Sequence, residues 1–340
     1  MDCKRGALGY CIECGNGGSE PCRLLSDTGQ VVGSGSLNDM QTLLGQELKN
    51  RYGDGRPNLP LWTLGGKQFW ADQYVFAGWR IQQNVFTGYH RLLNDDGVRR
   101  AWGTYEQCRA VFASIRAKQS ISTRSSRWVV LIHGLLRSAR SMDPLMSELE
   151  RAGYEVVSVN YPSTYSGIST HAHQIANVLD RVRHEVDSVS FVTHSMGGIV
   201  LRKLLSLDPS WTDHMEIGRI VMVAPPSKGS DLANLLSDWY PDGWIGEKGL
   251  EDLTPEEVNK LPYPETEFGI IAGIGPGDDG WNPALEGQDD GTLRLENVRT
   301  KEATDFMTVK QQHSLLMYDD RVASATRHFL ENGRFPDDEN

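Results

Sequence analysis

The chain has 340 residues, 39% of them hydrophobic and 23% charged, which is typical of a globular protein with one large α/β domain and an appendage, or with two domains. Lys and Arg number 34 against 45 Asp and Glu, and the net charge of −11 argues against nucleic acid or an anionic membrane surface as the main partner. No apolar run approaches the ~18 residues of a transmembrane segment, and residues 1–18 lack the apolar core of a secretory signal. The sequence as written therefore predicts a cytoplasmic protein, with secretion as the alternative if a leader is missing.

Cysteines are concentrated at the N-terminus. Cys3, Cys11, Cys14 and Cys22 lie within the first 22 residues, and Cys108 stands alone. The Cys-x2-Cys pair with two flanking thiols is compatible with a small four-thiolate zinc site. The outer spacings match no established zinc module, so a reduced and weakly ordered leader is the favoured interpretation, and no cofactor is expected.

The rest of the N-terminal region predicts a small α+β unit. Two extended segments joined by an Asp-Asp-Gly turn at 95–97 precede an amphipathic pattern that is typical of a helix. A polar stretch, 118–127, then marks a boundary. We therefore expect an N-terminal accessory region, 1–126, followed by a second domain, 127–340.

From residue 127 onward, apolar runs alternate with helical patterns. Continuous apolar runs predict strands that are buried on both faces, and Pro144 suits the first turn of a helix. Such alternation predicts an α/β protein with a mostly parallel, doubly wound sheet. The predicted strands are 128–132, 154–160, 189–193, 218–224 and 268–273, and the predicted helices are 143–152 and 169–186.

Residues 225–265 separate two of these strands by more than a crossover helix requires. An insertion of this length at the carboxyl edge of a sheet predicts a lid over a binding site. Trp239 and Trp244 lie within it, and aromatic side chains on a lid suit an acyl chain or a polymer surface. A lid packed shut by its own hydrophobic residues is the alternative.

Ser195 stands at the junction of a predicted strand and an apolar helix, in FVTHSMGGIVLRKLL. A nucleophile elbow requires such a sharp turn with small neighbours, which Gly197 and Gly198 provide. Thr193 occupies the position where the usual pattern has its first glycine. The alternative interpretation is a serine that only caps the helix.

A second motif, His133-Gly134, follows the first predicted core strand directly. A loop in this position supplies one backbone N–H of an oxyanion hole, and the residue after the nucleophile supplies the other. The sequence therefore predicts that Leu135 and Met196 hold the negative oxygen that develops during acyl transfer. Losing one such donor typically costs ~3–4 kcal/mol.

Residues 127–335 resemble the lipase-like α/β-hydrolases, which include bacterial triacylglycerol lipases and carboxylesterases. The motifs that carry the resemblance are, in order, HGLLRS (133–138), THSMGG (193–198), APPSKGSDLANLL (224–236), NPALEGQDDGTL (282–293) and QHSLLM (312–317). The resemblance implies the α/β-hydrolase fold and the hydrolysis of acyl esters by a Ser-Asp-His triad without a required cofactor. It covers about three-fifths of the chain and leaves 1–126 without a function.

The triad of this fold has the chain order serine, acid, histidine. Of the histidines after Ser195, His214 precedes every candidate strand for the acid, and His328 lies on the flank of a helix. His313 follows the predicted last strand, so it is the predicted general base. The remaining histidines of the predicted helix 169–186 are interpreted as surface residues, because their i, i+2 spacing presents no common face: His171, His173 and His184.

Two Asp-Asp-Gly stretches follow the nucleophile and leave the acid open. The stretch at 278–280 lies in a glycine-rich loop, whereas the one at 289–291 precedes an extended segment that can rejoin the core. A triad acid must be held to within about half an ångström, which favours the supported position. The resemblance also implies an Asp-Gly there. Asp290 is therefore the first candidate, Asp289 the second and Asp279 the third.

The leading hypothesis is a serine hydrolase that cleaves carboxylic esters, of the esterase or lipase type, through an acyl-enzyme intermediate. The expected substrate is an ester or lipid-like small molecule or a polymer, aliphatic polyesters included. The alternatives are an acyltransferase or thioesterase with the same triad, and a non-catalytic binding protein with a hydrolase fold. The residues expected to line the substrate pocket are His133, Leu136, Tyr161, His194, Trp239 and Trp244.

Overall fold

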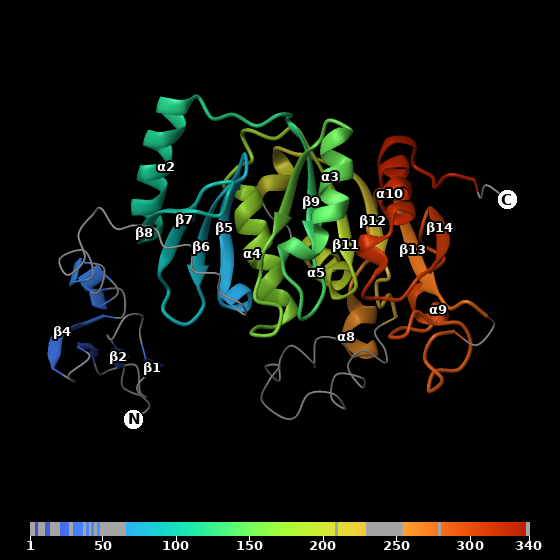
Figure 1. Ribbon diagram of the computed structural model, residues 1–340, viewed down its shortest axis with the longest axis horizontal. Helices are drawn as coiled ribbons and strands as arrows, with labels where there is room; N and C mark the ends of the chain where they lie inside the picture. The colour runs from blue at the N-terminus through green and yellow to red at the C-terminus, as the bar shows by residue number, and fades with distance from the viewer. Residues whose placement is uncertain are drawn as a thin grey trace. The chain divides into compact units, whose positions relative to one another are not determined.

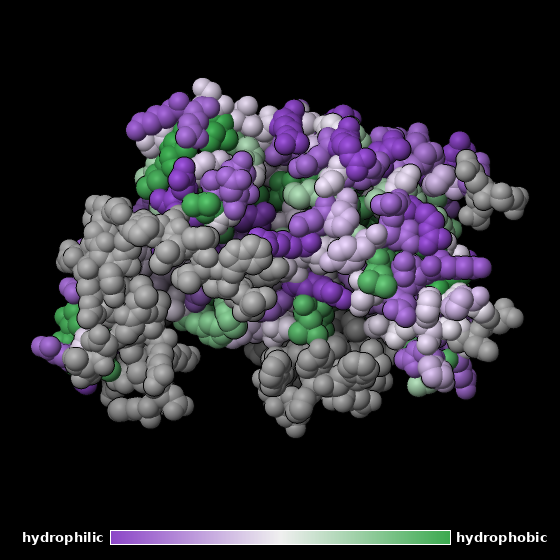
Figure 2. Space-filling view, viewed as in Figure 1, coloured by the Kyte–Doolittle hydropathy of each residue, from purple (hydrophilic) through white to green (hydrophobic). Residues whose placement is uncertain are grey.

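The computed structural model describes most residues after position 65 and short stretches before it. The continuous ranges are 66–207, 210–228, 254–277 and 280–337. Three predicted site residues, Trp239, Trp244 and Asp279, lie outside the described residues. None of the helices in the described part of the chain is long and apolar enough to cross a bilayer. In Figure 2, hydrophilic side chains dominate the coloured surface, and the hydrophobic patches are small.

The chain divides into two compact units. One comprises Met1–Leu64 with Gly78–Ile121, and the other comprises Gly65–Ala77 with Ser122–Asn340. This division differs from the boundary predicted after residue 126, because Gly65–Ala77 belongs to the second unit. The segment is hydrogen-bonded there: Asp72 N–H donates to Asn160 O at 2.9 Å.

The first unit contains two sets of antiparallel strands and one long helix. The helix begins with a capping box, in which Thr104 and Gln107 satisfy each other's backbone N–H, and ends at Ser120 with a left-handed φ of 52°. The helix matches its prediction, whereas the two predicted extended segments form three strands. In chain order the elements are β1 (Lys4–Arg5), β2 (Cys11–Glu13), β3 (Cys22–Leu25) and β4 (Val31–Gly35), then β6 (Trp79–Asn84), β7 (His90–Leu93), β8 (Arg99–Gly103) and α2 (Tyr105–Gln119).

The second unit is built on a six-stranded sheet in the order β10-β9-β11-β12-β13-β14. All five pairings are parallel, as the alternation of strands and helices predicts. The carboxyl ends of the strands therefore meet at one edge, which is the lower edge in Figure 1, where α8 and α9 also lie. The strands are β9 (Arg127–Ile132), β10 (Glu155–Val159), β11 (Ser188–His194), β12 (Glu216–Val223), β13 (Phe268–Ile274) and β14 (Asp305–Lys310), besides β5 (Trp70–Phe76).

Helices surround this sheet (Figure 1). The α-helices are α3 (Asp143–Arg151), α4 (Ile168–Asp180), α5 (Met196–Leu205), α8 (Pro255–Lys260), α9 (Leu295–Val298) and α10 (Asp320–Asn332), and the short 3-10 turns are η2 (Gly66–Phe69), η3 (Ala139–Met142), η4 (Ser210–Asp213) and η5 (Leu316–Tyr318). Helix α9 replaces the extended segment that was predicted after Asp290.

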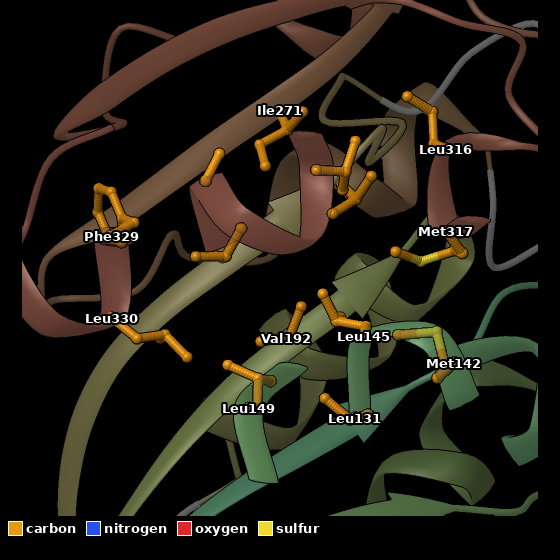
Figure 3. Packing of buried hydrophobic residues seen from close by; sticks show 14 of the residues in the cluster. Leu131, Met142, Leu145, Leu149, Val192, Ile271, Leu316, Met317, Phe329 and Leu330 are labelled. Carbon is orange, nitrogen blue, oxygen red and sulfur yellow. The ribbon is translucent and has the colours of Figure 1, made fainter. Parts of the chain in front are cut away.

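The hydrophobic core lies between α3, α10 and one face of the sheet (Figure 3). Leu145 and Leu149 of α3 and Phe329 of α10 are buried against Leu131 of β9 and Val192 of β11. Alternate strand residues, such as Val130, are also fully buried and point to the opposite face. Burial on both faces explains the continuous apolar runs and holds the carboxyl ends of the strands rigidly.

Helix α4 corrects one prediction. His171 is buried, with 1% of its surface exposed, whereas His173 and His184 are exposed as expected. The physical reason is that α4 packs against both α5 and β5, so more than one face of the helix is covered. Strand β5 lies about 100 residues before α4 in the sequence, so no local pattern predicts that it packs on this helix.

Candidate active site

Ser195 occupies a strained turn between β11 and α5. Its φ of 53° and ψ of −126° are unfavourable for a residue with a Cβ, and such a conformation costs about 1–3 kcal/mol. The two following glycines make room for the turn: a Cβ at Gly197 would clash with Ile132 O, and one at Gly198 would lie 2.9 Å from Pro225 Cβ. The turn has the geometry of a nucleophile elbow and lies at the carboxyl edge of the sheet.

The structure brings Ser195, His313 and Asp290 into one hydrogen-bonded chain. Ser195 Oγ lies 2.9 Å from His313 Nε2, and His313 Nδ1 lies 2.7 Å from Asp290 Oδ2. His313 follows β14 and Asp290 follows β13, so three parallel strands deliver the three side chains to the same edge. All three residues are buried. The arrangement has the geometry of a general base that is oriented by a carboxylate.

Asp290 is held from several directions. Its Oδ1 accepts the N–H groups of Thr292 at 3.0 Å and Leu293 at 2.8 Å, while Oδ2 faces the histidine. Its backbone carbonyl accepts His313 N–H at 2.8 Å. The carboxylate and the backbone of one residue therefore both fix the position of the base.

Asp289, the second acid candidate, points elsewhere. Its Oδ1 accepts three backbone N–H groups, from Gly291 at 2.6 Å, Asn282 at 3.0 Å and Trp281 at 3.1 Å. The residue is fully buried, and none of its contacts in the described part of the chain is with His313. Asp289 thus organises the loop that presents Asp290, a role that sequence reasoning missed because it treated the two carboxylates as competitors.

The predicted oxyanion loop lies directly against the nucleophile. A Cβ at Gly134 would be 3.1 Å from Ser195 Cβ and 3.3 Å from His194 Nδ1, so only glycine allows this approach without displacement. Within the described ranges, the N–H groups of Leu135 and Met196 donate to no protein acceptor. Two unengaged donors on either side of a nucleophile can hold a developing oxyanion.

A brace behind this loop was not predicted. Leu136 has a left-handed φ of 60°, and its N–H donates to Ser163 Oγ at 3.1 Å. Ser163 Oγ in turn donates to Gln68 Oε1 at 3.2 Å, and Gln68 Nε2 donates to Arg137 O at 2.6 Å. The bracing residues are separated by 69 and 95 positions in sequence, so no local signal reveals them.

Two predicted pocket residues form a buried stack behind the oxyanion loop. The His133 and Tyr161 rings are parallel, with centroids 4.1 Å apart, and Tyr161 OH donates to His133 O. Burial lowers the pKa of His133 to about 4 and, together with the neighbouring His133, that of His171 to about 4. His133 is fully buried, so its ring supports the loop. Leu136, by contrast, is exposed.

His194 connects the nucleophile to the loop of the base. Its Nε2 lies 3.1 Å from His313 O, and a carbonyl can only accept, so Nε2 carries a proton and donates it. Burial, followed by the nearby His313, holds the pKa of His194 well below its usual range. The ring is therefore neutral at neutral pH. A neutral donor at this point fixes the backbone of His313 without adding a charge.

Large apolar side chains are exposed on the loops at the carboxyl edge of the sheet. Leu136 follows β9, Trp281 follows β13, and Leu315 and Tyr318 follow β14. The same loops carry Leu135, Asp290 and His313, so these exposed apolar side chains lie on the segments that form the candidate site.

Arg202 of α5 ties together the two flanks of the predicted lid. The guanidinium is buried, and it donates to Ser227 O at 3.0 Å on one flank and to Val258 O at 3.0 Å on the other. It also lies over the Tyr263 ring, at 4.1 Å from the centroid. This role of Arg202 could not be predicted from the sequence, because its carbonyl partners are 25 and 56 residues away and no local pattern relates them to the helix.

The zinc hypothesis receives a partial test. Cys22 is disulfide-bonded, which removes one of the four thiolates of the proposed site and contradicts the expectation of a reduced leader. The side chains of Cys3, Cys11 and Cys14 lie outside the described residues. In the ranges that are described, no group of three or more His, Cys, Asp and Glu is arranged to hold a metal ion.

The second unit has the α/β-hydrolase fold, on the evidence of its parallel sheet, its elbow and the positions of its acid and histidine after β13 and β14. Residues 98–239 match a family model described as "Domain of unknown function (DUF7379)". No curated protein matches the sequence.

Solved structures with a similar fold include lipases and esterases. Lipase BlEst2 of Bacillus licheniformis in its mature form is 20% identical, with a TM-score of 0.45 over 56% of this chain and 85% of that chain. The metagenomic carboxyl esterase MGS0156 is 19% identical, with a TM-score of 0.47 over 62% and 76%. The lin2722 gene product of Listeria innocua is 17% identical, with a TM-score of 0.42 over 62% and 95%.

Proposed function

We propose that the protein is a serine hydrolase of carboxylic esters. The observation that carries the proposal is the hydrogen-bonded chain from Ser195 through His313 to Asp290, at 2.9 and 2.7 Å, on a strained elbow. Serine activation requires a base within hydrogen-bond distance and a third group that orients the base. Residues 1–126 supply no group that reacts in this mechanism; Gln68 acts only by supporting the oxyanion loop.

In the first half-reaction, Ser195 Oγ attacks the acyl carbonyl carbon and its proton passes to His313 Nε2. The resulting oxyanion is stabilised by Leu135 N–H and Met196 N–H. The ester C–O bond then breaks, and the alcohol leaves with the proton from His313. Asp290 holds the histidine in the tautomer that carries its proton on Nδ1, and stabilises the cationic ring.

In the second half-reaction, water attacks the acyl-enzyme and gives a proton to His313 Nε2. The bond between the acyl carbon and Ser195 Oγ breaks, and Oγ recovers the proton. The net result is one ester and one water converted to one acid and one alcohol. The exposed apolar side chains on the same loops favour a substrate with an apolar acyl or alcohol part.

The experiment is hydrolysis of p-nitrophenyl butyrate, octanoate and palmitate by the wild type, Ser195→Ala and Ser206→Ala. Ser206 is a matched control, because it is an exposed serine just after α5. We expect Ser195→Ala to abolish hydrolysis and Ser206→Ala to retain it. Labelling with a fluorophosphonate, followed by peptide mass spectrometry, should locate the label on Ser195. Undiminished hydrolysis by Ser195→Ala would disprove the mechanism.

A further inference from the structure

We propose that Arg137 binds an anionic group of the substrate, so that the site selects esters carrying a carboxylate or a phosphate a few bonds from the scissile carbonyl. This inference rests on the ester hydrolysis proposed above and adds a class of substrate to it. Three observations carry it: a fixed backbone, an unpaired guanidinium and a charge that acts on the active site.

The backbone of Arg137 is fixed beside the nucleophile. Arg137 N–H donates to Gly134 O at 3.3 Å, and Arg137 O accepts from Gln68 Nε2 at 2.6 Å. A Cβ built on Gly134 would lie 3.1 Å from Ser195 Cβ, so the backbone of this turn is close to the nucleophile. A side chain that leaves such a turn starts close to the acyl group bound at Ser195. Because the turn is already ordered, little backbone entropy is lost when this side chain binds a ligand.

The guanidinium of Arg137 has no partner within the described part of the second unit. It is half-buried, whereas Arg140 and Arg334, which also lack partners there, are exposed. The other arginines of this unit pair with carboxylates, carbonyl or amide oxygens, or aromatic rings: Arg124, Arg127, Arg151, Arg181, Arg183, Arg202, Arg219, Arg294, Arg299, Arg321 and Arg327. The guanidinium of Arg137 thus keeps its N–H donors available for a ligand in a chain whose net charge is −11.

The charge of Arg137 acts toward the active site. After burial and His313, it contributes to the lowered pKa of His194, whose fully buried ring precedes the nucleophile. The guanidinium therefore lies within electrostatic range of the residue that precedes Ser195.

The chemistry of arginine defines the ligand. Its planar guanidinium offers paired N–H donors that match the two oxygens of a carboxylate or phosphate. Partial burial strengthens such an interaction relative to a fully exposed pair. A neutral ester gains nothing from this group, so selection acts on charge rather than on acyl length alone.

The test compares pairs of esters that differ in charge, of which the acyl-side pair is also isosteric. On the acyl side, monoethyl adipate is compared with ethyl adipamate, in which a neutral amide replaces the carboxylate. On the alcohol side, 3-acetoxypropyl phosphate is compared with 3-acetoxypropanol. Acid release at pH 8 is followed in low salt and in 0.5 M NaCl, and the quantity measured is the ratio of kcat/KM for the anionic ester to that for its neutral partner.

The variants are Arg137→Gln, Arg137→Lys and Arg140→Gln. In the wild type we expect the ratio to exceed one for at least one of the two pairs, mainly through KM, and to fall in high salt. Arg137→Gln should lower this ratio about ten- to hundredfold, the size of a charge-assisted hydrogen bond, and Arg137→Lys should lower it less. Arg140→Gln, an exposed charge only three residues away, should leave the ratio unchanged.

The outcomes separate this inference from the proposed function. If the wild type hydrolyses both members of each pair equally well, or if Arg137→Gln and Arg140→Gln lower the ratio to the same extent, the anion subsite is disproved while ester hydrolysis stands. If the wild type hydrolyses neither these esters nor the p-nitrophenyl esters, the proposed function itself fails; if it hydrolyses only the p-nitrophenyl esters, the anion subsite alone is disproved. A preference confined to one pair assigns the anion to the acyl or to the alcohol side.

Discussion

The turn at 95–97 and the loop at 289–291 share the sequence Asp-Asp-Gly and a left-handed glycine, with φ of 75° at Gly97 and 91° at Gly291. In the first, both aspartates are exposed and the turn is closed by Asn94, whose Oδ1 accepts Val98 N–H at 2.7 Å.

In the second copy, both aspartates are buried, and their carboxylates themselves accept five backbone N–H groups. Asp-Asp-Gly therefore forms a turn in both places. Its carboxylates become part of a site only where they are buried and surrounded by N–H donors. Buried and exposed histidines differ in the same way.

We expect the largest effect from a substitution in the buried Asp-Asp-Gly, at Asp290. Asp290→Asn should lower kcat on p-nitrophenyl butyrate by about ten-thousandfold, because an amide cannot hold His313 in the required tautomer. The fold should persist, since the amide oxygen still accepts from Thr292 and Leu293. Circular dichroism and urea denaturation check the fold. A loss of less than tenfold would show that Asp290 is not the triad acid.

The second prediction distinguishes the role of Asp289 from that of Asp290. Asp289→Ala removes the acceptor of three buried N–H groups, so we expect kcat to fall about ten- to hundredfold through misplacement of Asp290, with KM changed less. The unfolding free energy should fall by about 1–3 kcal/mol.

Asp289→Asn keeps an oxygen in the position of Oδ1 and should restore most of the activity. If Asp289→Asn were instead as inactive as Asp290→Asn, the assignment of the two residues would have to be exchanged.

The third prediction compares a buried histidine, His171, with an exposed one, His173, through the pH dependence of stability. The pKa of His171 is about 4 in the folded protein against about 6.5 when unfolded, so the unfolded state binds more protons between these values. The stabilisation is complete above pH 6.5 and is lost as the pH falls toward 4. We expect this one residue to cost about 2 kcal/mol of unfolding free energy between pH 7.5 and 5.0.

His171→Phe should reduce this pH dependence, and His173→Phe should not, because His173 is exposed two residues away on the same helix. Urea denaturation at the two pH values measures the difference. Equal slopes for the two variants would show that burial of His171 does not govern acid stability.

The smallest effect concerns the exposed copy of the tripeptide. Asp96→Asn changes an exposed carboxylate that accepts one hydrogen bond in the described part of the chain, from Asn94 Nδ2 at 3.3 Å. We expect the unfolding free energy to change by less than about 0.5 kcal/mol and esterase activity to remain. A large loss in this variant would contradict the view that burial separates the two copies.

Much of the second unit could be predicted because its signals are local. Continuous apolar runs marked β9, β11, β12 and β13, and small residues after Ser195 marked the elbow. Chain order then reduced the histidines to His313, and the need for support favoured Asp290 over the glycine-rich alternative. These inferences depend only on neighbours in sequence and on the parallel order of strands.

What escaped prediction depends on contacts between distant segments. The burial of His171 follows from β5 packing on α4, and the support of the oxyanion loop follows from Gln68 and Ser163. The role of Asp289 depends on N–H groups from Trp281 and Asn282, whose direction no pattern specifies. These three features depend on packing and hydrogen bonds between distant segments. The pattern of apolar and polar residues along the sequence does not predict such contacts.

The clamp formed by Arg202 bears on how this enzyme fold could be engineered. Ser227 and Val258 are fixed to the same guanidinium, on the helix that begins at the nucleophile. The span between them therefore starts and ends at two anchored points. Loop-closure entropy grows only slowly with length, so the span is a natural place to graft segments of other lengths from related enzymes. Such chimeras would exchange the residues between Ser227 and Val258 while leaving the two anchor points in place.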